Sequence, residues 1–140
     1  MVFKIYTDGA SRGNPGISAS GYVVFDGYMK MVGERYFYNG KATNNAAEYK
    51  AVIGALEFVL GMVERDKDIE LYSDSQIVVR QLKGDYKVRE AGLKELHGKA
   101  LALLSSFKSY KLFNVPREDK NISYVDRQLN HLLDGITAGV

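Results

Sequence analysis

The stretch "IYTDGASRGNPG", residues 5–16, contains the pattern from which the rest of the chain can be interpreted. The β-branched and aromatic residues before Asp8 are typical of a strand, and the glycines, Asn14 and Pro15 after it are typical of a turn. We therefore expect a strand over residues 2–7 that ends at Asp8. A loop without bulky side chains should follow it. An aspartate in such a place also suits an ordinary turn.

The remaining elements follow from hydrophobic periodicity and turn signals. We expect further strands over residues 21–26, 31–38, 69–74 and 110–115, and helices over 44–66, 75–84, 89–107 and 125–135. Three strands with short connections precede alternating helices and strands. This order predicts the α/β class, with a five-stranded mixed sheet and helices on its faces. We expect one domain over residues 1–140.

Composition limits the possible functions. Of the 140 residues, 46% are hydrophobic and 26% are charged, as in a folded globular protein, and none is cysteine. Disulfides and thiolate metal sites are therefore excluded. The first ten residues lack the apolar core of a signal peptide, and the apolar run 51–63 is too short to span a membrane. We expect a cytoplasmic protein without membrane contact.

Charge is unevenly distributed along the chain. Residues 80–120 carry ten lysines or arginines against five acidic residues. This segment could lie along a polyanion, or it could be an ordinary solvated surface.

Three acidic residues besides Asp8 lie where elements begin or end. Asp74 ends the strand 69–74, Glu48 lies in the first turn of the helix 44–66, and Asp126 opens the last helix. Each has a structural alternative: Asp74 as a helix cap, Glu48 in a capping box with Asn45, and Asp126 as a favourable charge at a helix N-terminus. Together, four carboxylates without cysteine suit a hard cation such as Mg²⁺ or Mn²⁺.

Four segments together resemble type 1 ribonuclease H. They are "YTDGASRGNPG" (6–16), "TNNAAEYKAVIGAL" (43–56), "YSDSQIVVRQLKGDYKV" (72–88) and "VDRQLNHLLD" (125–134). They occur in the order found in that family and span nearly the whole chain. The resemblance implies the ribonuclease H-like fold. It also implies an endonuclease that hydrolyses the RNA strand of RNA–DNA hybrids, leaving 5′-phosphate and 3′-hydroxyl ends.

The resemblance further implies that Asp8, Glu48, Asp74 and Asp126 hold two Mg²⁺ ions, with Mn²⁺ as a possible substitute. Asp8 would bridge both ions. Asp126 would help hold the ion beside the attacking water, and Glu48 and Asp74 the ion beside the leaving 3′ oxygen. The loop after Asp8 would let a nucleic-acid backbone come close.

The same resemblance assigns substrate contacts. Asn14, Asn45 and Gln76 match positions in the minor groove of the hybrid. Thr43 and Asn44 match positions near phosphates of the DNA strand. Ser11 and Arg12 are weaker candidates, and Arg12 could equally be a solvated surface arginine. Nothing in the sequence requires more than a monomer.

Two features depart from the family pattern. Many members carry a histidine in the loop before the last acid, whereas "VPREDKNISYVD" (115–126) contains none. Arg117 or Glu118 could replace it. This loop is also longer than in close relatives, so Asp119 and Asp134 compete with Asp126 for the fourth position. The alternatives are a module that binds hybrids without cutting them, or a related nuclease that also cuts double-stranded RNA.

Overall fold

The structure, a computed structural model, describes residues 1–138. Its centre is one five-stranded sheet with the strand order β3-β2-β1-β4-β5. The strands are β1 (Val2–Gly13), β2 (Gly16–Phe25), β3 (Met31–Ala42), β4 (Asp68–Ser73) and β5 (Ser109–Asn114), and the helices are α1 (Asn44–Leu60), α2 (Gln76–Leu82), α3 (Ala91–Leu104) and α4 (Lys120–Ala138). The first three strands pair antiparallel, and β1, β4 and β5 pair parallel. The expected mixed sheet is confirmed.

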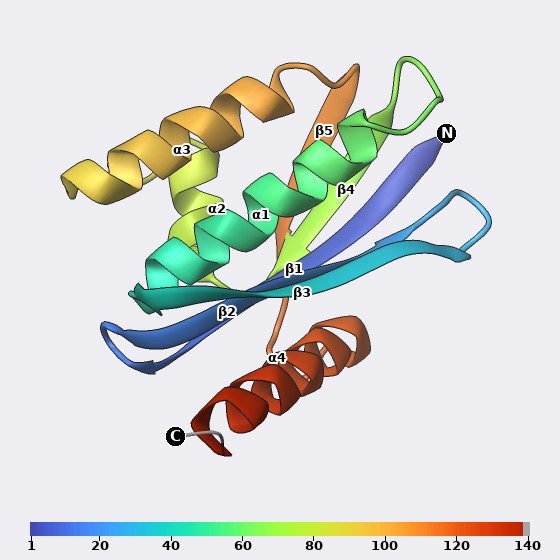
Figure 1. The fold of residues 1–140 in the computed structure, drawn as a ribbon. Coiled ribbons are helices and arrows are strands. Elements are labelled where there is room, and N and C mark those ends of the chain that lie inside the picture. Colours follow the sequence, from blue (N-terminus) through green and yellow to red (C-terminus); the bar gives the residue numbers. More distant parts are fainter. Residues whose placement is uncertain (139–140) are drawn as a thin grey trace.

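The two faces of the sheet are covered very differently (Figure 1). Helices α1, α2 and α3 lie on one face, where they enclose the larger hydrophobic core around Tyr49, Leu56 and Leu71. Helix α4 lies alone on the other face, and its residues Val125 and Leu129 pack against Tyr6 and other apolar side chains of β1 and β2. Within residues 1–138, no helix combines the length and the apolar character that crossing a membrane requires.

Several element boundaries differ from the sequence-based expectation: β2 begins at Gly16 rather than residue 21, β3 ends at Ala42 rather than residue 38, and three further differences have a visible cause. Strand β1 does not end at residue 7 but continues to Gly13, because residues 8–13 keep their antiparallel pairing with β2. Helix α1 ends at Leu60 rather than residue 66, since Gly61 caps it with its backbone N–H donating to the Glu57 carbonyl.

The third difference concerns the last helix. Helix α4 begins at Lys120 rather than at residue 125. The Asp119 carboxylate accepts hydrogen bonds from the backbone N–H groups of Asn121 (2.9 Å) and Ile122 (3.1 Å), which satisfies the first turn. The expectation that Asp126 opens this helix is therefore wrong, because Asp119 already provides the start. Asp126 lies in the second turn.

Candidate active site

Asp8 lies where the two neighbours of the central strand diverge. The parallel pairing of β1 with β4 ends at the pair Thr7–Ser73, whereas the antiparallel pairing of β1 with β2 continues. Asp8 and Asp74 are the next residues on the two parallel strands. Because parallel strands end at the same edge of a sheet, their carboxylates come together there. Asp8 thus lies at the end of a strand pairing rather than, as expected, at the end of a strand.

Glu48 reaches the same edge because α1 packs unusually close to β1 at Gly9. A Cβ atom on Gly9 would lie 2.5 Å from the carbonyl carbon of Ala47 and 2.5 Å from the backbone nitrogen of Glu48. Only glycine permits this approach. The expectation that a loop follows Asp8 is therefore wrong, because residues 9–13 continue the strand and Gly9 admits a helix. Gly9 and Ser11 still line the pocket, and the approach of a nucleic-acid backbone there stays a prediction.

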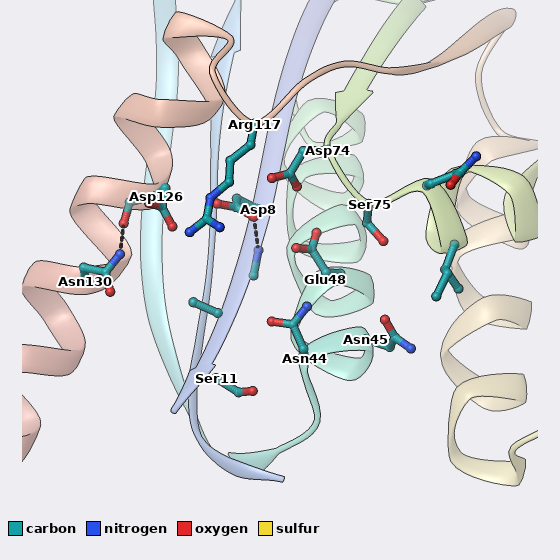
Figure 2. Close-up of a pocket in the computed structure, with 14 residues that line it drawn as sticks. Asp8, Ser11, Asn44, Asn45, Glu48, Asp74, Ser75, Arg117, Asp126 and Asn130 are labelled. Atoms are coloured by element: carbon teal, nitrogen blue, oxygen red, sulfur yellow. Dashed lines mark hydrogen bonds between the residues drawn. The ribbon is translucent and has the colours of Figure 1, made fainter. Parts of the chain in front are cut away.

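The three carboxylates form a compact and largely buried group. One oxygen from each of Asp8, Glu48 and Asp74 lies within 4.8 Å of the others. Asp8 is 4% exposed and Glu48 3% exposed. Figure 2 shows the three side chains converging from β1, α1 and the end of β4. We call these residues the carboxylate trio.

Burial and mutual repulsion make negative charge on the trio unfavourable. Burial, followed by the charge of Asp74, raises the pKa of Asp8 to about 7. Burial and the charge of Asp8 raise the pKa of Glu48 well above its usual value. Burial also raises the pKa of Asp74, partly opposed by the positive charge of Arg117. A bound cation would relieve this repulsion.

The structural alternatives for these acids are contradicted by the caps of both helices. Thr43, not Asn45, caps α1, and its side chain accepts a hydrogen bond from the Ala46 N–H. Glu48 therefore has no part in a capping box. Ser75, not Asp74, caps α2 by accepting from the Val78 N–H. Neither acid has a capping role to account for its position.

Asp126 faces the trio from the opposite layer (Figure 2). It lines the same pocket, and its charge contributes to the raised pKa values of Asp8 and Asp74. It is not part of the group within 4.8 Å. Its two competitors have other contacts: Asp119 caps α4, and Asp134 forms an ion pair with Arg12.

The pocket above the carboxylates has a volume of about 580 Å³. Besides the four acids, its lining includes polar side chains suited to hydrogen bonding, namely Ser11, Asn44, Asn45, Ser75, Gln76, Arg117 and Asn130. The candidates Asn44, Asn45 and Gln76 are thus in the pocket. Asn14 and Thr43 lie outside its lining, beside the start of α1, where Asn14 Oδ1 accepts from the Asn44 N–H at 3.0 Å.

Sequence reasoning did not identify Asn130. Its spacing from Asp126 was the available signal, because residues four apart share a helix face. Arg117 was considered only as a replacement for the missing histidine. Its guanidinium reaches into the pocket between Asp8 and Asp126 (Figure 2), whereas Glu118 is not among the lining residues.

One oxygen of the trio lacks a hydrogen-bond partner, as expected at a metal site. Among residues 1–138, Glu48 Oε2 is a buried oxygen without a hydrogen-bond partner. A buried carboxylate oxygen without a donor is costly unless a cation completes its contacts. All the ligand atoms are carboxylate oxygens, which hard divalent cations prefer.

Comparisons with known proteins agree with this site. A family model described as reverse transcriptase-like matches residues 6–125. A ribonuclease HI of Halobacterium salinarum is 43% identical over 112 residues, which is 80% of this chain and 55% of that protein. A bifunctional protein of Mycobacterium tuberculosis is 35% identical over 135 residues, 96% of this chain but 36% of that protein. The chain thus spans about half or less of these curated relatives.

Solved structures match over almost their full length. The crystal structure of the Halobacterium salinarum RNase H1 superposes with a TM-score of 0.86 at 39% identity, covering 96% of this chain and 99% of that one. LC11-RNase H1, solved in complex with an RNA/DNA hybrid, superposes with a TM-score of 0.88 at 37% identity. This match also covers 96% of this chain and 99% of that one. The family model spans three of the four segments that carry the resemblance, and the chain belongs to the type 1 ribonuclease H family.

Proposed function

We propose that this chain hydrolyses the RNA strand of RNA–DNA hybrids and leaves 5′-phosphate and 3′-hydroxyl ends. The observation that carries the proposal is the buried carboxylate trio with its unpartnered Glu48 oxygen, at the floor of a pocket lined by amides. The similarity to a ribonuclease solved with a hybrid supports the choice of substrate. Residues 1–140 would act as one ribonuclease H domain.

Asp8, Glu48, Asp74 and Asp126 would hold two Mg²⁺ ions, and Mn²⁺ could replace them. When bound, such ions lower the pKa of an attacking water and stabilise charge on the leaving oxygen. The central place of Asp8 between Glu48, Asp74 and Asp126 suits it to contact both ions. Because Asp8 and Glu48 are buried, charge on their carboxylates is poorly solvated until a cation binds.

The amide side chains along the pocket would bind the hybrid. Asn45 and Gln76 in the pocket, and Asn14 beside it, offer both donors and acceptors, which suit the 2′-hydroxyl groups and base edges in a minor groove. Asn14 and Thr43 lie beside the pocket, and each uses a side-chain oxygen to accept a helix N–H. The Thr43 hydroxyl and the Asn44 amide carry donors that suit a phosphate of the DNA strand. Such contacts recognise shape, so little sequence preference is expected.

We assign to Arg117, rather than Glu118, the position that many family members give to a histidine. Its guanidinium lines the pocket and lowers the pKa of Asp74. An arginine keeps its proton at any physiological pH, so it cannot transfer one as a histidine can. Its role would be to stabilise negative charge on the phosphate or its leaving group.

All four carboxylates come from one chain, which supports action as a monomer. The absence of cysteine in the 140 residues is compatible with the cytoplasm.

A cleavage assay tests the proposal. The same end-labelled RNA is presented as a hybrid, as duplex RNA and as a single strand, each with Mg²⁺, Mn²⁺ or EDTA. We expect internal cuts in the hybrid that disappear with EDTA and in Asp8→Asn. Cutting of duplex RNA at a similar rate would instead favour the broader nuclease. Binding without cutting would make the chain a hybrid-binding module.

A further inference from the structure

Arg12 connects the central strand to the helix that carries Asp126. It lies on β1 four residues after Asp8, and alternation along a strand puts both side chains on the same face of the sheet. That face is the one covered by α4. The two residues in contact, Arg12 and Asp134, are 122 positions apart in the sequence.

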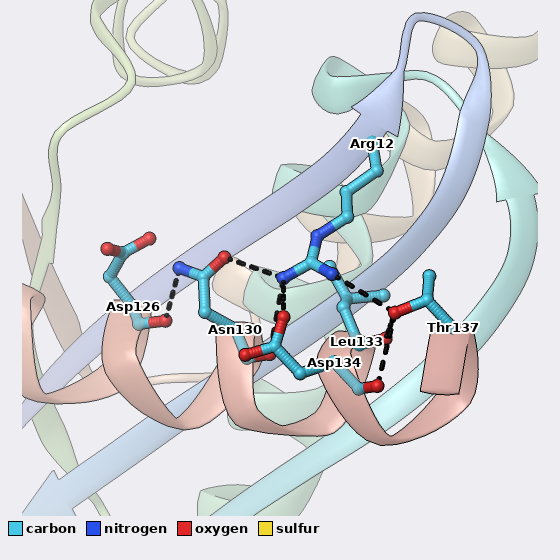
Figure 3. A network of polar contacts seen from close by, with 6 residues as sticks. All are labelled: Arg12, Asp126, Asn130, Leu133, Asp134 and Thr137. Atoms are coloured by element: carbon cyan, nitrogen blue, oxygen red, sulfur yellow. Dashed lines mark hydrogen bonds and ion pairs between the residues drawn. The ribbon is translucent and has the colours of Figure 1, made fainter. Parts of the chain in front are cut away.

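The guanidinium makes four contacts, all with α4 (Figure 3). Its Nη2 donates to Asp134 Oδ1 at 2.5 Å, and to both the carbonyl and Oδ1 of Asn130 at 3.3 Å. Its Nη1 donates to the Thr137 hydroxyl at 3.5 Å. The planar fork thus contacts several turns of the helix at once, which fixes a helix in both rotation and translation better than one bond does.

The contacts continue along α4 to Asp126. Asp126, Asn130 and Asp134 follow one another at spacings of four, so they lie along one side of the helix. Asn130 Nδ2 donates to the backbone carbonyl of Asp126 at 3.0 Å. Asn130 therefore contacts both the guanidinium and the turn that carries Asp126 (Figure 3).

This connection matters because the position of Asp126 depends on how α4 packs against the sheet, whereas Asp8 and Asp74 lie on paired strands. The remaining contacts of α4 with the sheet are mainly apolar, through residues such as Val125 and Leu129. Apolar contacts are not directional and allow a helix to shift or rotate slightly. A second polar contact between α4 and the sheet is from the Tyr124 hydroxyl to Glu34 Oε2, at 3.2 Å.

Stability alone does not explain the arrangement. The side chain of Arg12 is 34% exposed and that of Asp134 is 68% exposed. Ion pairs this exposed contribute little to the free energy of unfolding. An exposed contact with several hydrogen bonds can nevertheless fix the orientation of the helix.

We propose that Arg12 is a positioning residue for Asp126: it fixes α4 against β1 so that the fourth carboxylate faces the trio. This inference rests on the proposed function, since it deepens the role of Asp126 in that site. Arg12 would act through the helix and would not touch the substrate.

The test compares Arg12→Met with the wild type in single-turnover cleavage of a hybrid. We expect the maximal rate to fall about fivefold, because small displacements of a catalytic group are costly, while half-saturation by hybrid stays within about twofold. In an Asp126→Asn background the same change should have no further effect. Arg12→Lys should recover little, because an ammonium group lacks the planar fork.

Mn²⁺ binding, followed by electron paramagnetic resonance, gives a readout that does not depend on cutting. Loss of a nearby positive charge by itself would strengthen Mn²⁺ binding, whereas a displaced Asp126 weakens it. We expect weaker binding in Arg12→Met and in Arg12→Lys, which keeps the charge but lacks the planar fork and serves if Arg12→Met does not fold. Arg35→Met removes a strand arginine that stacks on Phe37, and should leave Mn²⁺ binding unchanged.

Two results would overturn the inference. Weaker hybrid binding together with a rate loss that persists in Asp126→Asn would make Arg12 a substrate contact. Unchanged rate and unchanged Mn²⁺ binding would show that it has no role in the site. If the wild type fails to cut hybrids, the proposed function fails, while the Mn²⁺ comparison still decides whether Arg12 positions Asp126.

Discussion

The two faces of the sheet hold their catalytic candidates by different means. On the face covered by α1, α2 and α3, close backbone packing at Gly9 holds Glu48 against the edge at which β1 and β4 place Asp8 and Asp74. On the other face, α4 is held by a small apolar cluster and by side-chain contacts at Arg12 and Tyr124. One half of the site depends on backbone geometry, and the other on the placement of a single helix. The two halves should therefore respond differently to substitution and to pH.

The largest effect is expected from Gly9→Ala. The added methyl group would lie 2.5 Å from backbone atoms of α1, so the helix must move away from β1 and carry Glu48 with it. We expect the free energy of unfolding to fall by about 3 kcal/mol, with activity lost in the fraction that stays folded. Urea denaturation and the cleavage assay measure both.

Gly98→Ala is the matched control, since a Cβ at that helical position meets nothing within 4 Å. It should raise the free energy of unfolding by about 0.5–1 kcal/mol. A Gly9→Ala protein as stable and active as the wild type would show that close packing at Gly9 does not fix the trio.

The second prediction concerns pH in the absence of divalent ions. The pKa of Asp8 is raised from 3.8 to about 7 by burial and by Asp74, so in that interval the folded protein binds more protons than the unfolded chain. The free energy of unfolding in EDTA should therefore fall as pH rises from about 4 through 7. Divalent cations should reverse this loss.

Asp8→Asn removes the repulsion and should raise the free energy of unfolding at pH 8 in EDTA by about 2 kcal/mol. Asp66→Asn, at an exposed position, is the control and should keep the wild-type dependence on pH. Thermal denaturation at pH 5 and pH 8 provides the measurement. A higher free energy of unfolding at pH 8 than at pH 5 in EDTA would contradict charge repulsion within the carboxylate trio.

The third prediction compares the two layers directly by hydrogen exchange. Because α4 packs only on the sheet face with the smaller apolar cluster, its amides should open with a free energy about 1–2 kcal/mol below that of α1. Arg12→Met should widen this difference. Equal protection of α1 and α4 would remove the distinction between the faces.

The smallest effects are expected at the helix caps. Thr43→Ala and Asp119→Ala each remove a side-chain acceptor at the start of a helix and should cost about 1 kcal/mol. Only Asp119→Ala should accelerate exchange in α4, and only Thr43→Ala in α1. Exchange measured by mass spectrometry separates the two, and a change that spreads to both helices would mean that they open together.

Local patterns in the sequence predicted much of the fold. Strand composition and helical periodicity are local properties, so the order of the nine elements within residues 1–138 was predictable. The four carboxylates could be named because the family segments surround them. The end of β1 and the start of α4 could not be predicted. Pairing with β2 extends the strand, and the cap at Asp119 starts the helix earlier than the local signals indicate.

Long-range contacts account for what the sequence did not predict. The role of Gly9 depends on how closely α1 approaches, which no local pattern records. The contact of Arg12 with Asp134 joins residues 122 positions apart, and strand and helix periodicity carry no information about such pairs.

We propose above that the four carboxylates hold the divalent ions that cleavage requires. Diffraction at the manganese absorption edge, from a wild-type crystal grown with a hybrid and soaked in MnCl₂, locates such ions. We expect anomalous peaks in contact with Asp8, one beside Glu48 and Asp74 and one beside Asp126. Cleavage-competent crystals with manganese elsewhere, or with none at Asp8, would contradict it.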